Sequence, residues 1–193
     1  CKGLASVISL GSVGEIPNCM FDGCTLLSTV TIPSSASKIG GYAFRNSIIT
    51  EISLPGTTEI CANGMRGCGA LTTVTLGTSL AIIRDSAFKD CQNLAGTITF
   101  PNTLTTIEKE AFMGDYKIKV LSFTGGGSAT VAIGNKAFYG CLGITTVGFG
   151  PVREIGNEAF YGCSSLTDIT LPPTVASVGD RAFEGCTVLK KAE

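Results

Sequence analysis

Apolar and polar positions alternate in a short segment that returns throughout the chain. Residues 29–32 read T-V-T-I, residues 73–76 read T-V-T-L, and residues 168–171 read D-I-T-L. A period of two is typical of a β-strand with one buried face, so the apolar positions should point inward and the others toward solvent. The expected inward positions in these three segments are Val30 and Ile32, Val74 and Leu76, Ile169 and Leu171.

A second pattern, I-G-x-x-A-F, lies between the alternating segments and marks the start of a repeat unit of 21 to 26 residues. The units begin at Ile16, Ile39, Ile60, Ile83, Ile107, Ile133, Ile155 and Val178. Self-similarity with such a period is typical of a solenoid, because one short unit cannot bury its apolar side alone and must stack on its neighbours. We therefore predict a single domain, residues 1–193, of about eight coils, and expect it to be a fragment of a longer array.

The two patterns together predict a β-rich solenoid. Each coil should contribute one alternating strand to one long parallel sheet, and the I-G-x-x-A-F arc should return on the opposite side through short turns, 3₁₀ pieces or minor strands. The phenylalanines of the arc are expected to stack as an aromatic spine inside the coils. They are Phe44, Phe88, Phe112, Phe138, Phe160 and Phe183.

Cysteines recur at one fixed place, eight residues after the repeat start, which indicates a packing role. They are Cys24, Cys68, Cys91, Cys141, Cys163 and Cys186. Stacked coils about 5 Å apart would also permit disulfides, but Ser47 and Asp115 take the same place in two units and interrupt any regular pairing. We expect a ladder of small buried thiols. Cys19 and Cys61 lie off this ladder and are expected to be exposed.

Composition and charge narrow the range of functions. The formal net charge is −1, so no global field draws the chain to nucleic acid, and no apolar run reaches the roughly 18 residues that membrane insertion needs. The chain has no histidine and no C-x-x-C pair, which removes the usual general base and the usual zinc spacing. We predict no enzymatic activity, no cofactor and no metal. The glycine-rich residues 124–130 (TGGGSAT) lack the Gly-Lys-Ser/Thr of a phosphate loop and are a candidate contact loop instead.

The repeat resembles the BspA-type leucine-rich repeat, whose signature is C-x-x-L-x-x-I-x-L-P followed by I-G-x-x-A-F. Residues 163–183 (CSSLTDITLPPTVASVGDRAF) show this signature nearly complete. The commoner leucine-rich repeat has Asn at a position that holds Ser35, Thr57, Ser79 and Thr174 here. The resemblance implies a curved parallel leucine-rich-repeat array and a cell-surface or extracellular setting, in which such arrays act as adhesins on matrix proteins or other cells. It supplies no catalytic residues to carry over.

The outward strand positions form the candidate binding face, because they can vary without disturbing the core. They are Thr29, Thr31, Glu51, Ser53, Thr73, Thr75, Thr97, Thr99, Ser122, Thr146, Asp168 and Thr170. Threonine also suits any exposed strand, which explains much of the pattern without a ligand. The functional hypothesis is a weakly polar surface that docks a protein or glycan partner. An intracellular or assembly-embedded scaffold, favoured by the thiol ladder, remains the alternative.

Overall fold

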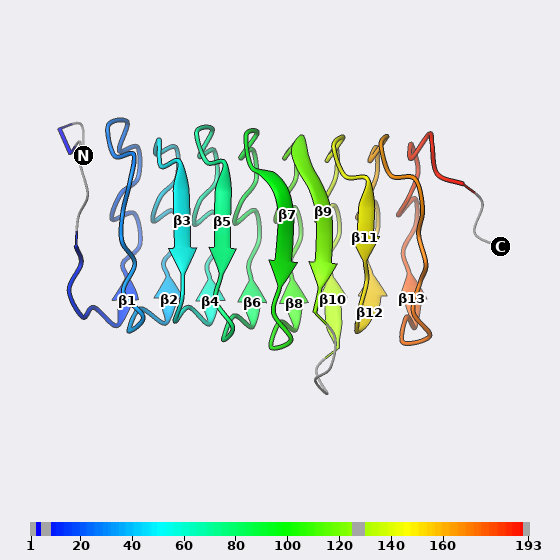
Figure 1. Ribbon diagram of the computed structural model, residues 1–193, viewed down its shortest axis with the longest axis horizontal. Coiled ribbons are helices and arrows are strands. Elements are labelled where there is room, and N and C mark those ends of the chain that lie inside the picture. The colour runs from blue at the N-terminus through cyan, green and yellow to red at the C-terminus, as the bar shows by residue number, and fades with distance from the viewer. Residues whose placement is uncertain (1–2, 5–8, 125–129, 191–193) are drawn as a thin grey trace.

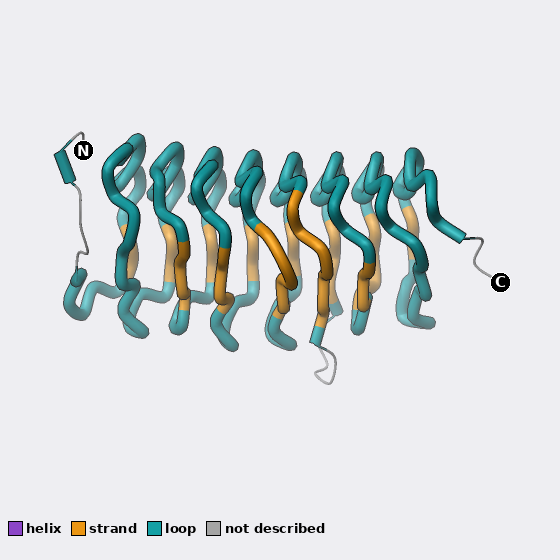
Figure 2. Tube along the Cα trace, turned by 45° about the horizontal axis from the view of Figure 1, so that its top comes forward, coloured by secondary structure: helices purple, strands orange, loops and turns teal. Residues whose placement is uncertain are grey.

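The computed structural model describes residues 3–4, 9–124 and 130–190, and it is a parallel β-solenoid (Figure 1). Successive coils stand side by side in a row, with the N-terminal coils at one end and the C-terminal coils at the other. Figure 2 shows strands on two sides of the row, joined by turns. No helix occurs in the described part of the chain, so the predicted fold class is confirmed.

The longest sheet is built from the repeat starts. Its eight strands pair in parallel in the order β1-β2-β4-β6-β8-β10-β12-β13, and each contains one of the eight repeat starts. The strands are β1 (Glu15–Ile16), β2 (Lys38–Ile39), β4 (Glu59–Ile60), β6 (Ile82–Ile83), β8 (Thr106–Ile107), β10 (Val131–Ile133), β12 (Val152–Ile155) and β13 (Ser177–Val178). Sequence reasoning expected only minor strands on this side.

The alternating segments form two further parallel sheets, so the expectation of one long sheet is wrong. One contains β3 and β5, and the other has the order β11-β9-β7. The strands are β3 (Glu51–Leu54), β5 (Thr73–Leu76), β7 (Ala95–Phe100), β9 (Lys117–Phe123) and β11 (Thr146–Gly148). The break falls before β7, where seven positions rather than six separate the ladder cysteine from the inward strand residue. Gly96 in this segment is left-handed, at φ 75°. The register of β7 against β9 also shifts between Gly96 and Thr97, where Lys119 of β9 has no paired residue.

The return arcs contain two left-handed residues each, which explains why they are turns and contain no 3₁₀ piece in the described residues. The third position after each repeat start has φ between 56° and 59° in all eight arcs, as at Tyr42 and Glu158. A second left-handed residue follows four positions later, as at Gly114 and Gly162. Alternation of right- and left-handed backbone stops a helix from propagating.

The aromatic spine is confirmed in the centre of the coils. Phe88, Phe112, Phe138 and Phe160 are fully buried, and neighbouring rings stack at centroid distances of 4.9 to 5.2 Å. Phe183 continues the stack at 5.3 Å from Phe160 but is only half-buried. The spine and the surrounding Leu, Ile and Val side chains form one continuous core along the row.

The cysteine ladder is also confirmed, and its thiols have defined partners. Five of the six ladder thiols donate to a carbonyl at the spine position of the preceding coil, as Cys68 does to Phe44 O at 2.9 Å and Cys141 does to Phe112 O at 3.0 Å. The described cysteines are free thiols. Cys19 is exposed as expected, whereas Cys61 is half-buried.

One inward prediction fails near the C-terminal end of the row, because Leu171 has 38% of its surface exposed. The last repeat start, Val178, is also exposed, at 46%. Residues 168–171 form an isolated bridge to β11 through Asp168 and no strand of their own. β13, which holds Val178, pairs with β12 alone. Both side chains therefore lack a described coil that would cover them on the far side.

The position that holds Asn in the commoner leucine-rich repeat uses hydroxyl groups here. Ser35 donates to Val13 O at 2.9 Å, Thr57 to Ala36 O at 3.2 Å, and Thr174 to Val152 O at 2.9 Å. Each bond joins neighbouring coils and gives a backbone carbonyl a hydrogen-bond partner. The hydroxyl residues therefore link the coils without a long asparagine side chain.

Candidate functional site

The predicted binding face lies on the side of the row that carries β3, β5, β7, β9 and β11, and we call it the threonine face. It comprises the twelve outward residues given above. Ten of them are exposed, and Thr29 and Ser122 are half-buried. Exposure follows from strand geometry, since the intervening Ile52, Val74 and Ile98 point into the core.

Parallel pairing brings most of these residues into rows across the coils. Glu51 pairs with Thr73, and Ser53 pairs with Thr75. Further along, Thr99 pairs with Ser122, and Thr146 bridges to Asp168. Thr170 is exposed but belongs to no strand. The face is thus ordered along its length but interrupted where β5 and β7 do not pair.

Two shallow hollows lie on the threonine face. The first, of about 520 Å³, is lined by Thr29, Thr31, Glu51, Ser53, Thr73 and Thr75 together with Pro55 and inward strand residues. The second, of about 560 Å³, shares Thr73 and Thr75 and adds Thr97, Thr99, Pro101 and Thr124. Because they share two residues, the hollows form one trough across four coils, those of residues 29–32, β3, β5 and β7. Glu51 is the one charged residue among those that line it.

The arrangement offers contact surface and hydrogen bonds rather than reaction chemistry. Threonine hydroxyls both donate and accept, but they need an activating base to act as nucleophiles. No group of three or more metal-ligating side chains occurs within residues 3–4, 9–124 and 130–190. Burial raises the pKa of the Cys91, Cys141 and Cys163 thiols, which keeps these groups in the unreactive protonated form. The candidate loop at 124–130 lies mostly outside the described residues, because 125–129 are not among them.

A second surface lies on the eight-stranded sheet and was not predicted from the sequence. The residues that flank the repeat starts include charged side chains, and these form ion pairs between neighbouring coils. Arg84 bonds to Glu59 and to Glu108, both at 2.8 Å, and Lys38 lies 3.6 Å from Glu59. The hydrogen bond from Arg84 lowers the pKa of Glu59. The sequence does contain these opposite charges, at the positions directly before or after the repeat start, as Lys38 and Glu59 are before theirs. The pattern becomes visible only when the units are aligned on their isoleucine.

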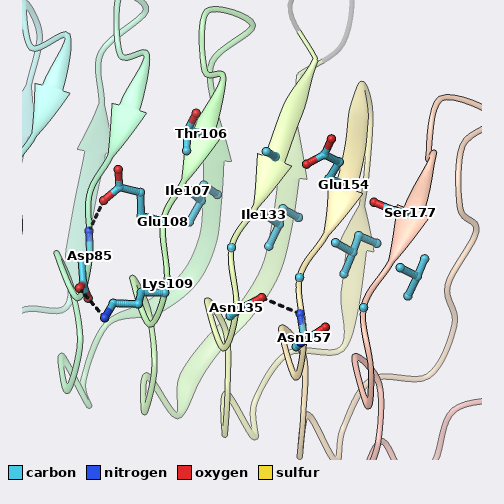
Figure 3. Close-up of a pocket in the computed structure, with 16 residues that line it drawn as sticks. Asp85, Thr106, Ile107, Glu108, Lys109, Ile133, Asn135, Glu154, Asn157 and Ser177 are labelled. Atoms are coloured by element: carbon cyan, nitrogen blue, oxygen red, sulfur yellow. Dashed lines mark hydrogen bonds and ion pairs between the residues drawn. The ribbon is translucent and has the colours of Figure 1, made fainter.

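A groove of about 640 Å³ follows this ion-pair chain, across the coils of β8, β10, β12 and β13 (Figure 3). Its floor contains Ala132 and three glycines, Gly134, Gly156 and Gly179. The glycines have a structural cause, since a Cβ at any of them would lie 2.4 to 2.9 Å from atoms of the preceding coil. The missing side chains leave the sheet surface hollowed at this place.

The fold and its surfaces define a leucine-rich-repeat solenoid, a class of repeat protein known for protein interaction. The model of the BspA type leucine rich repeat region matches residues 1–119 and 131–193, with 6 copies. The chain belongs to this family, which comprises non-enzymatic repeat proteins. No curated protein matches the sequence.

Similar solved structures are bacterial leucine-rich repeat proteins. One from Bacteroides ovatus is 27% identical with a TM-score of 0.57, covering 98% of this chain and 60% of that one. A leucine rich cell surface protein from Faecalibacterium prausnitzii is 26% identical with a TM-score of 0.55, covering 98% of this chain and 53% of that one. The leucine rich repeat protein of T. pallidum has a TM-score of 0.72 at 24% identity, with coverage of 94% and 87%, and shares the fold. The chain thus spans little more than half the length of the first two proteins.

Residues 3–4, 9–124 and 130–190 contain no helix that is long and apolar enough to cross a membrane.

Proposed function

We propose that this chain is a protein-binding module of a cell-surface protein, an adhesin segment that docks a host matrix or cell-surface macromolecule on the threonine face. The observation that carries the proposal is the trough, which gathers eight of the twelve predicted residues, Thr29 to Thr99, on four neighbouring coils. The Faecalibacterium prausnitzii protein, described as a cell surface protein, supports the surface setting.

The chemistry of the trough suits a protein partner. Threonine is β-branched, so its χ1 angle is already restricted on a strand. Little side-chain entropy is therefore lost when a partner covers it. Its hydroxyl and methyl groups offer hydrogen bonds and apolar contact side by side. A nearly uncharged surface also avoids the desolvation of fixed charges on docking.

The test is label-free binding of the chain to immobilised fibronectin and fibrinogen. The Thr75→Lys, Thr99→Lys double variant places two charges in the trough, where docking would have to desolvate them, and we expect binding to weaken by about tenfold or more. Thr106→Lys is the matched control, since Thr106 lies at the start of β8 on the other sheet and should leave binding unchanged. Equal binding of the double variant and the wild type would contradict a role for the threonine face.

A scaffold inside a cell or an assembly is the second candidate, and the buried thiol ladder favours it. Thiols such as those of Cys68 and Cys141 donate to carbonyls of the preceding coil, and free thiols persist in reducing compartments. Alkylation of protein from its native source, unfolded in denaturant without reductant and followed by intact mass, separates the candidates. Modification of all 9 cysteines favours the scaffold, and disulfides favour the surface protein.

A further inference from the structure

Asp115 places a carboxyl group in the buried cysteine ladder, between the coils that carry the thiols of Cys91 and Cys141. The residue is fully buried, and neither of its carboxyl oxygens has a hydrogen-bond partner within the described residues. A buried charge without a partner is costly, so such a group is either paired or neutral. The protonation state of Asp115 therefore decides how this coil packs.

The ladder position supplies hydrogen-bond donors. In five coils the thiol at this position donates to the carbonyl of the spine position in the preceding coil. The same carbonyl also accepts the backbone N–H of the ladder residue in its own coil. Phe112 O, for example, accepts from the Asp115 N–H at 3.3 Å and from the Cys141 thiol at 3.0 Å. These spine carbonyls thus have two donors each.

The carbonyl that corresponds to Asp115 in this pattern belongs to Phe88. It accepts the backbone N–H of Cys91 at 3.1 Å, and no side chain among the described residues donates to it. A carboxylate only accepts hydrogen bonds, whereas a protonated carboxyl has an O–H where the neighbouring coils have an S–H. Protonation of Asp115 therefore supplies the donor that the ladder lacks at this coil.

The groups packed against Asp115 favour its neutral form. The Cys91 and Cys141 thiols face it from the two neighbouring coils, and the Asp90 carboxylate lies on the preceding arc. No ion pair among residues 3–4, 9–124 and 130–190 includes Asp115. Burial raises the pKa of Asp115, and the charge of Asp90 adds to the rise. The Cys91 N–H opposes this effect, but it is already bonded to Phe88 O.

Asp115 also lies where the opening of one coil would affect a surface. β9 begins at Lys117, two residues further on, and pairs with β7. β7 carries Thr97 and Thr99 of the trough. Each coil of a solenoid contacts only its neighbours, so a coil in the middle of the row can open without unfolding of the whole chain.

We propose that Asp115 is a pH-dependent latch. When it is protonated, it donates to Phe88 O and closes the ladder. When it loses the proton, it leaves the core and opens the arc of its own coil, residues 107–116, to solvent. The latch responds to the proton alone and does not depend on a partner at the threonine face.

The first experiment measures the protonation state. ¹³C NMR of the folded chain, labelled at its aspartate carboxyl carbons, follows each group between about pH 4 and pH 8, and the Asp115 signal is assigned by its loss in Asp115→Asn. We expect this signal to show the protonated form at about pH 6, two units above the ordinary aspartate pKa of about 3.9. Asp22, whose pKa is lowered by Arg45, should be ionised there and serves as the control. An ionised Asp115 at pH 6 would overturn the proposal.

Amide hydrogen exchange measures the opening. The open coil has an ionised carboxyl and the closed coil a protonated one, so the opening constant, corrected for intrinsic exchange, should rise about tenfold per pH unit. The reporters are the amides of Phe112 and Gly114, and the controls are those of Met65 and Gly67, which make the equivalent bonds two coils earlier. At about pH 7 we expect the reporters to open at least about tenfold more often than the controls.

Two variants remove the ionisable group. Asp115→Asn keeps the side-chain shape and supplies an N–H donor, and Asp115→Cys restores the ladder thiol. In both we expect the reporter opening constants to become independent of pH. The proposal is overturned if reporters and controls open equally in the wild type, because the whole row would then unfold together. It is also overturned if either variant, shown to be folded by far-UV circular dichroism, retains the pH dependence.

Discussion

Asp115 occupies the ladder position that cysteine holds in the neighbouring coils, and we expect it to make stability depend on pH. The residue is fully buried, and neither carboxyl oxygen has a hydrogen-bond partner among the described residues. Burial raises the pKa of Asp115 well above its usual range, because the charged form is poorly solvated in the core. The folded state therefore binds the proton more tightly than the unfolded state does.

The direction of the effect follows from this difference. The folded protein has its full stability while Asp115 is protonated in both states, below the unfolded pKa of about 3.9. That stability is lost as the pH rises toward the raised pKa of the folded state. Between these two values the free energy of unfolding falls by about 1.4 kcal/mol per pH unit.

The perturbation is Asp115→Ser, since Ser47 occupies the same ladder position three units earlier and lies 3.5 Å from the Cys68 thiol. Urea unfolding of wild type and variant, followed by far-UV circular dichroism from about pH 4 to pH 7, gives the difference in stability at each pH. Titration of surface carboxylates such as Asp22, whose pKa is lowered by Arg45, cancels in that difference. We expect the variant to gain on the wild type steadily as the pH rises. A constant difference across the range would refute the buried, proton-binding Asp115.

Three further predictions concern the core and the thiols. Phe138→Ala removes a fully buried ring of the spine and should lower the free energy of unfolding by about 3 to 5 kcal/mol; a loss below about 1 kcal/mol would contradict the spine. Gly156→Ala places a Cβ at 2.6 Å from backbone atoms of the preceding coil, so it should lower the free energy of unfolding by about 1 to 3 kcal/mol. Gly69→Ala is the control, because its Cβ would meet open space, and it should lower the free energy of unfolding much less. Iodoacetamide should modify the exposed Cys19 in the folded protein and reach the buried Cys141 only after unfolding, as peptide mass spectrometry would show; equal rates would contradict the ladder.

The repeat made the core predictable. The spacing of the Ala-Phe pairs and of the ladder cysteines predicts that Phe112 and Cys91 are buried, because a residue that returns once per coil must meet its own copies in the neighbouring coils. The outward positions of the strands followed from period two, and they are exposed or half-buried as expected.

The features that were not predicted depend on contacts between coils. The break in pairing before β7 arises from one additional residue near Gly96, and its effect on register cannot be read from hydrophobic alternation. The eight-stranded sheet is made of strands of two to four residues, which are too short to show a period. The groove on the eight-stranded sheet depends on small residues, such as Ala132 and Gly156, that meet in neighbouring coils. Leu171 has the inward pattern of its equivalents but lacks a described neighbour to cover it.

The most direct test of the proposed threonine face is a methyl NMR titration of the chain, labelled with ¹³C at its threonine methyl groups, with a fibronectin or fibrinogen fragment that binds it. Thr31, Thr73, Thr75 and Thr99 report on the trough, and Thr106 reports on the opposite sheet. The account predicts that the trough methyls shift or broaden with saturation while the Thr106 methyl does not change. Perturbation of Thr106 with the trough methyls unchanged would show that partners bind elsewhere and would contradict the account.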